Sequence, residues 1–67
     1  MTIKDKLGRE VNPGDAVVLL VKDYGYRKIK DAHLHICTYR GKGQYGYEFR
    51  EGHILRIVLR NPELVKI

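Results

Sequence analysis

The segment from Gly8 to Val18 constrains the fold of this chain more than any other stretch. Within it, Asn12-Pro13-Gly14-Asp15 predicts a tight type II turn, because Pro13 fixes φ near the value needed at the second position and Gly14 supplies the positive φ needed at the third. An unbroken apolar run, rich in valine, follows from Ala16 to Val21 and has the length and composition of a buried strand. The sequence therefore predicts a turn that leads into the first core strand.

Further short strands, each bounded by turn residues, are predicted along the rest of the chain. An opening strand at residues 2–4 is followed by a turn at 5–8, in which Gly8 takes a positive φ. Later strands are predicted at residues 28–40, 44–50, 53–60 and 64–67, separated by an exposed loop at 22–27, a hairpin tip at 41–43 and turns at 51–52 and 61–63. Strands at this spacing predict an all-β fold, either a small antiparallel barrel of about five strands or a strongly bent sheet. Closure into a barrel would also remove exposed strand edges.

Alternation of side chains along these strands predicts which residues share a face. In residues 28–40 the apolar pattern assigns Leu34, Ile36 and Thr38 to the core face of the strand. The opposite face then carries His33, His35, Cys37 and Tyr39. In the strand predicted at residues 44–50, one face carries Tyr45, Tyr47 and Phe49. In the strand predicted at 53–60, one face carries Leu55, Ile57 and Leu59.

The chain length of 67 residues predicts a single domain over residues 1–67. A single cysteine, Cys37, excludes an internal disulfide and favours a reducing compartment, so we expect a cytoplasmic protein. Apolar runs in the sequence are much shorter than a membrane span, and residues 1–6 lack the apolar region of a signal peptide. A monomer or a weak dimer is expected.

The spacing Asp5-x-x-Gly8-x-x-Val11-x-x-Gly14-Asp15-x-Val17 resembles the opening of small SH3-like barrels, including KOW-type domains and short phage-encoded proteins of the same build. The ending at residues 61–67 is similar to their closing pattern, in which a short helical turn leads into a terminal strand. This resemblance implies an SH3-like barrel that binds DNA or RNA. It also implies an alternative, a protein-interaction module of the phage type that modulates a host protein machine. KOW domains have a glycine before the second core strand, where this chain has Asp31-Ala32.

The net charge of +5 lies entirely between Lys22 and Arg60, where nine basic residues face four acidic ones. Such a block attracts phosphate groups or an acidic protein surface. The alternative is that these charges only keep a small protein soluble.

Aromatic residues are interleaved with this basic block, and that mixture is typical of nucleic-acid binding. Bases stack on aromatic faces with about 1–3 kcal/mol each, while lysine and arginine neutralise phosphates. The alternative for Tyr45, Tyr47 and Phe49 is that they form the core face of their strand. The predicted nucleic-acid-binding residues are Tyr24, Tyr26, Arg27, Lys28, Lys30, Arg40, Lys42, Tyr45 and Arg56.

His33, His35 and Cys37 alternate on one strand face, and His53 could approach from a neighbouring strand. These residue types bind zinc, but their spacing matches no zinc-finger pattern, and side chains set side by side do not form a nucleophile and base pair. We therefore expect no metal, no cofactor and no enzymatic activity.

Overall fold

The computed structural model describes residues 2–67, and all of their regular elements are strands. Two short strands, β1 (Ile3–Lys4) and β2 (Glu10–Val11), precede two long ones, β3 (Ala16–Gly25) and β4 (Lys28–Lys42). Three shorter strands follow: β5 (Tyr47–Glu51), β6 (Leu55–Leu59) and β7 (Glu63–Lys66). The all-β prediction is confirmed, and no helix in residues 2–67 is long and apolar enough to span a membrane.

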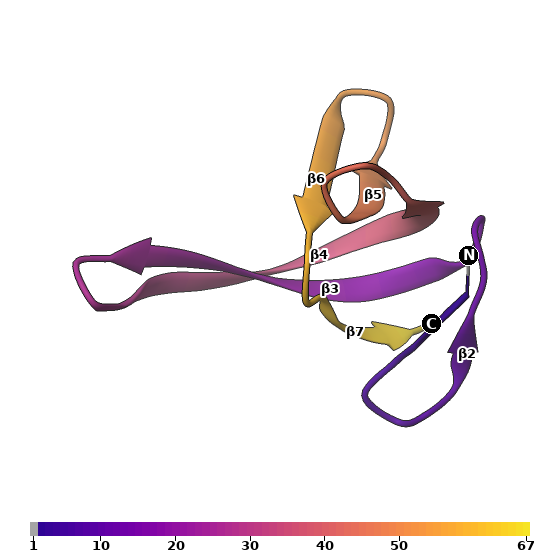
Figure 1. The fold of residues 1–67 in the computed structure, drawn as a ribbon, viewed down its shortest axis with the longest axis horizontal. Helices are drawn as coiled ribbons and strands as arrows, with labels where there is room; N and C mark the ends of the chain where they lie inside the picture. Colours follow the sequence, from indigo (N-terminus) through magenta and orange to yellow (C-terminus); the bar gives the residue numbers. More distant parts are fainter. Residues whose placement is uncertain (1) are drawn as a thin grey trace.

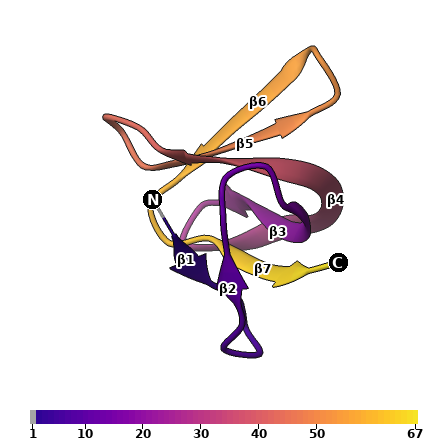
Figure 2. The ribbon, with the colours of Figure 1, turned by 90° about the vertical axis from the view of Figure 1, so that its right-hand side faces the viewer.

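Five of the strands form one antiparallel sheet in the order β6-β5-β4-β3-β7. β1 and β2 form a separate two-stranded ribbon, which lies on the β7 side of the molecule, away from the β5–β6 hairpin (Figure 2). No sheet formed by residues 2–67 is closed, so the structure is a bent open sheet rather than a closed barrel.

The core lies between the bent sheet and the β1–β2 ribbon. Its buried members come from five strands: Val11, Val17, Leu19, Cys37, Tyr39, Phe49 and Leu64. Tyr39 packs on Phe49 with the ring centroids 5.3 Å apart. Since the sheet supplies most of these side chains from one face, that face defines the inside of the molecule.

The structure shows that the predicted faces of β4 are inverted. Cys37 and Tyr39 point into the core, whereas Leu34 and Ile36 are 71% and 67% exposed. Alternation is retained, but the side assigned to the core is wrong because the aromatic Tyr39 meets Phe49 on the other face. The trio Tyr45, Tyr47 and Phe49 also separates, since Phe49 is buried and Tyr45 lies in the loop before β5.

The turn at residues 12–15 forms as predicted. The amide of Asp15 donates to the carbonyl of Asn12 at 3.0 Å, and Gly14 has φ of 101°. The turn is held against β4, since Gly14 N donates to Tyr39 O at 2.8 Å and Tyr39 N donates to Asp15 O at 3.0 Å. Gly8 also takes a positive φ, of 78°.

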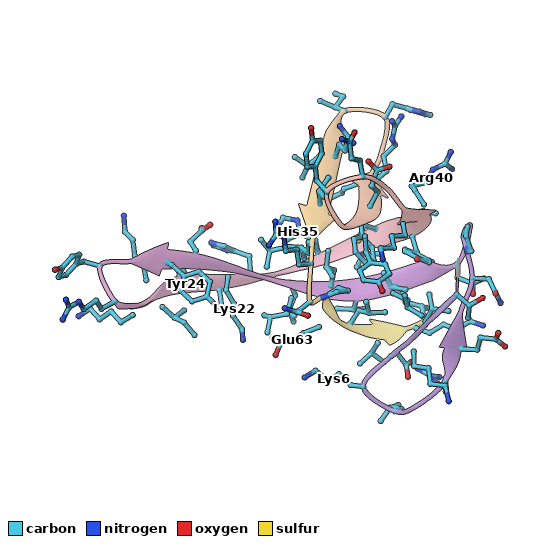
Figure 3. All side chains as sticks on the ribbon, viewed as in Figure 1. Lys6, Lys22, Tyr24, His35, Arg40 and Glu63 are labelled. Carbon is cyan, nitrogen blue, oxygen red and sulfur yellow. The ribbon has the colours of Figure 1, made fainter. Side chains whose placement is uncertain are left out.

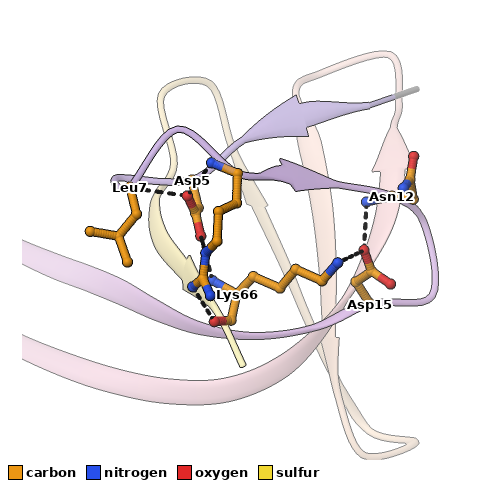
Figure 4. Close-up of polar contacts among 6 residues, drawn as sticks. Asp5, Leu7, Asn12, Asp15 and Lys66 are labelled. Carbon is orange, nitrogen blue, oxygen red and sulfur yellow. Dashed lines mark hydrogen bonds and ion pairs between the residues drawn. The ribbon is translucent and has the colours of Figure 1, made fainter.

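Asp5 joins the β1–β2 ribbon to β7 (Figure 4). Its buried carboxylate accepts hydrogen bonds from the backbone amides of Leu7 (2.9 Å), Arg9 (2.8 Å) and Lys66 (3.0 Å), and from Arg9 Nε (3.0 Å). Burial alone would raise the pKa of Asp5, but these hydrogen bonds outweigh it and lower the pKa to about 2. The carboxylate is therefore ionised throughout the neutral range.

Two predicted loops have different bounds in the structure. The region 22–27 is mostly strand, because β3 runs to Gly25 and only Tyr26 and Arg27 form the turn. The tip predicted at 41–43 is displaced toward the C-terminus, because β4 continues through Lys42 and the loop spans 43–46. The first shift lengthens the β3–β4 pair, which projects as a ribbon from the rest of the molecule (Figure 1). The second lengthens the pairing of β4 with β5.

Candidate nucleic-acid interface

The projecting end of the β3–β4 hairpin, residues 21–33, is called the arm below. β7 pairs with β3 only over Val17–Leu20, and β5 pairs with β4 only from Thr38 onward. Within the arm, the two strands therefore pair only with each other. The register shifts between Asp23 and Tyr24, so Lys30 has no partner across the ladder. Such a bulge increases twist and redirects the side chains beyond it.

The arm tip gathers five of the nine predicted residues. Tyr24 and Tyr26 are 70% and 86% exposed, and the guanidinium of Arg27 lies 5.3 Å from the ring centroid of Tyr26. Lys28 and Lys30 are exposed on the neighbouring strand. Within residues 2–67, Arg27, Lys28 and Lys30 form no ion pair. The tip thus offers exposed aromatic faces beside three cations that no carboxylate neutralises.

Arg27 adopts φ of 61°, which is uncommon for a residue with a side chain. A two-residue hairpin turn needs positive φ at a central position, and glycine or asparagine supplies it at lower cost. Holding arginine there costs on the order of 1–2 kcal/mol. The strain places a long cationic side chain at the outermost point of the arm.

Acidic residues on the arm lie closer to its base. His33 Nε2 lies 3.1 Å from Asp31 Oδ2 and 3.7 Å from Asp23 Oδ2. Lys22 pairs with Glu63 at 2.8 Å, and this contact raises the pKa of Lys22. The lysine at the base is therefore neutralised, and the positive charge of the arm is concentrated at the tip.

The other four predicted residues lie near the opposite end of β4, as the positions of Tyr24 and Arg40 show (Figure 3). Arg40 and Lys42 are exposed on β4, with Lys42 Nζ 5.8 Å from the ring centroid of Tyr47. Tyr45 is exposed in the 43–46 loop, and Arg56 on β6 pairs with Glu48. The nine residues thus form two separate groups rather than one continuous surface.

A hollow that the sequence did not reveal, called the arginine hollow below, lies beside the second group. It is lined by Thr38 and Arg40 from β4, Arg50 from β5, and Gly52 and His53 from the following turn. Thr38 is directly opposite Arg50 in the ladder. Two arginines and a hydroxyl facing one hollow are suited to a phosphate group. The sequence does contain a signal for Arg50. Because side chains alternate along a strand, a core position for Phe49 places the next residue, Arg50, on the outer face.

The histidines and the cysteine do not converge. His35 Nδ1 lies 2.7 Å from Glu51 Oε2, His33 is engaged by the arm carboxylates, and His53 lies by the arginine hollow. Cys37 is buried; that burial, reinforced by the charge of Glu51, raises the pKa of its thiol to about 11, so the thiol stays protonated at neutral pH. Within residues 2–67, no group of three histidine, cysteine or carboxylate side chains is arranged to hold a metal ion.

Comparisons with protein-family models, with curated proteins and with solved structures find no match to this chain.

Proposed function

We propose that this protein binds nucleic acid through the arm tip. The observation that carries the proposal is the placement of two exposed tyrosines among three cations that make no ion pair within residues 2–67. Unpaired bases would stack on Tyr24 and Tyr26, and Arg27, Lys28 and Lys30 would contact the phosphates. A narrow ribbon can also reach a nucleic acid without bringing the rest of the protein close to it.

The arginine hollow is proposed as a second phosphate contact. Arg40 and Arg50 lie far from the tip, so a strand that reached both would follow the long axis of the β3–β4 hairpin. Each phosphate neutralised on single-stranded nucleic acid contributes about −0.7 to the slope of log K against log salt. Three tip cations alone would give a slope near −2, and engagement of the hollow would make it steeper.

We further propose that the fold is an open variant of the SH3-like, KOW-like barrel and that the protein acts in the cytoplasm. The bent five-stranded antiparallel sheet and the Asn12–Asp15 turn before β3 support the fold proposal. The single free cysteine supports the cytoplasmic location.

The test is a fluorescence-anisotropy titration of labelled single- and double-stranded DNA and RNA at several salt concentrations. Tyr26→Ala is expected to weaken binding about fivefold to a hundredfold, which corresponds to the loss of one stacked base. Arg27→Gly removes a charge and also relieves the strained φ, so weaker binding by this variant cannot be attributed to unfolding.

Arg60→Gln is the matched control, because Arg60 is exposed but lies outside both groups. Tyr45→Ala reports separately on the second group. If Arg27→Gly and Arg60→Gln weaken binding equally, the arm tip is not the contact surface. If no nucleic acid binds at physiological salt, the proposal is wrong, and the tip is then a candidate for an acidic protein partner.

A further inference from the structure

The face of the sheet that points away from the core has an apolar region in the middle of β3 and β4 and on the adjoining part of β7. Val18 lies opposite Ile36 on one side and Val65 on the other, and Leu20 lies opposite Leu34. These five residues are called the outer apolar face. Leu34 and Ile36 are largely exposed, and the other three are partly buried.

This face combines a hollow with a projection. The hollow, of about 410 Å³, is lined by Val18, Leu20, Leu34, Leu64 and Val65, with Lys6 and Glu63 at its margin. Ile36 projects beside it and is 67% exposed. A projection next to a hollow on one surface is self-complementary, because a twofold axis would place the Ile36 of each copy over the hollow of the other.

The charged residues that line this hollow, Lys6 and Glu63, are paired. Glu63 lies 2.8 Å from Lys22 and 3.4 Å from Lys6, and these hydrogen bonds lower the pKa of Glu63. The centre of the face therefore does not favour a charged partner. It favours another apolar surface of similar twist, and sheet faces pack on one another at about 10 Å separation.

The area is sufficient for association of modest strength. The outer apolar face and the adjoining exposed Ile29 and Ala32 present on the order of 400 Å² of apolar surface. A standard interface buries about 800 Å² per partner, of which roughly 60% is apolar. The paired charges and neighbouring polar groups would supply the remaining rim.

We infer that the outer apolar face is a homodimer interface, in which two copies of this chain pack sheet against sheet about a twofold axis. This inference does not depend on the proposed nucleic-acid binding, and the two are tested by different measurements.

The experiment is sedimentation velocity of the full chain from low micromolar to about 1 mM, without nucleic acid. The wild type is expected to show a monomer–dimer equilibrium with a dissociation constant in the micromolar range. Leu34→Gln and Ile36→Thr are each expected to weaken it about tenfold or more. Both changes are uncharged, so the net charge stays at +5 and electrostatic repulsion is unchanged.

Ile54→Gln is the matched control, since Ile54 is 97% exposed but lies in the β5–β6 turn. Ile54→Gln is expected to dimerise like the wild type. Melting curves at low concentration check that each variant is folded, which is expected because Leu34 and Ile36 contribute little to the core. A wild type that stays monomeric to about 1 mM, or variants at 34, 36 and 54 that dimerise equally, would overturn the inference.

Discussion

Gly46→Ala is expected to lower the free energy of unfolding by about 3 kcal/mol or more, because position 46 combines a strained φ with a close backbone contact. Gly46 ends the 43–46 loop with φ of 146°, and its carbonyl accepts a hydrogen bond from Gly43 N at 2.8 Å. A Cβ at this position would lie 2.7 Å from the carbonyl oxygen of Leu59 and 2.9 Å from its carbonyl carbon. Both atoms belong to the backbone at the end of β6, so no side-chain rotation relieves the overlap.

Two contributions make up this magnitude. A side chain at so large a positive φ costs about 1–3 kcal/mol, and displacing packed neighbours costs about another 1–3 kcal/mol. For a domain of this size each kcal/mol lowers Tm by about 4–8 °C, so a decrease of more than about 10 °C is expected. Gly52→Ala separates the two contributions, because Gly52 has φ of 63° but open space around it. Only the left-handed backbone is penalised there, by about 1 kcal/mol.

Urea unfolding followed by far-UV circular dichroism measures both variants against the wild type. Tyrosine fluorescence provides a second probe of the same transition, since the chain has five tyrosines and no tryptophan. Gly46→Ala is expected to be the less stable variant by about 2 kcal/mol, or to be unfolded under conditions where Gly52→Ala is folded. If the two variants are equally stable, the 43–46 loop does not pack against the end of β6 as described.

Three further changes address other parts of the fold. The pKa of Asp5 is about 2 in the folded protein and near 4 in the unfolded chain, so its stabilising effect is present above pH 4 and is lost as the pH falls toward 2. Urea unfolding measured from pH 7 to pH 2 should therefore show that the difference in unfolding free energy between wild type and Asp5→Asn shrinks between pH 4 and pH 2. Leu19→Ala is expected to lower the free energy of unfolding by about 2–5 kcal/mol, because Leu19 is fully buried. Leu34→Ala at low protein concentration should lower it by less than about 0.5 kcal/mol, and chemical denaturation measures both. Arg56→Ala is expected to change stability by less than about 1 kcal/mol, because its pairing with Glu48 is largely exposed to solvent.

A constant difference between wild type and Asp5→Asn down to pH 2 would mean that the carboxylate does not hold the amide of Lys66. Equal costs for Leu19→Ala and Leu34→Ala would mean that β4 has the opposite face in the core. Arg60→Ala is the control for Arg56→Ala. If Arg56→Ala lowers the free energy of unfolding by several kcal/mol and Arg60→Ala does not, Arg56 is more than a surface partner of Glu48.

Turn chemistry made much of the fold predictable. Pro13 and Gly14 specify their turn locally, and valine-rich β3 follows directly from it. The choice of core face in β4 is different, because alternation separates Leu34 and Ile36 from Cys37 and Tyr39 without saying which set is inside. That choice depends on the contact of Tyr39 with Phe49 across the β4–β5 ladder, which no local pattern encodes.

The residue types of the candidate interface could be predicted, but their grouping could not. The sequence places Lys28 and Arg40 within one basic block, and both belong to a single strand. Because β4 has 15 residues, its two ends lie far apart, and each end joins a different set of neighbours. Sequence patterns indicated where strands occur and gave the start of β4 correctly, but they ended β3 at Val21 and β4 at Arg40, whereas these strands run to Gly25 and Lys42.

The hydrogen bond from Lys66 N to Asp5 spans 61 positions of the chain, and this separation has a consequence for the order of folding. β3 and β4 are joined by two residues and can pair within microseconds, whereas the ends of the chain must be brought together before Asp5 meets Lys66. We expect this contact to be absent from the transition state. Asp5→Asn should then accelerate unfolding and leave the refolding rate nearly unchanged. The contact between Asp5 and Lys66 would thus form late in folding. It would determine how long the molecule stays folded rather than how fast it folds.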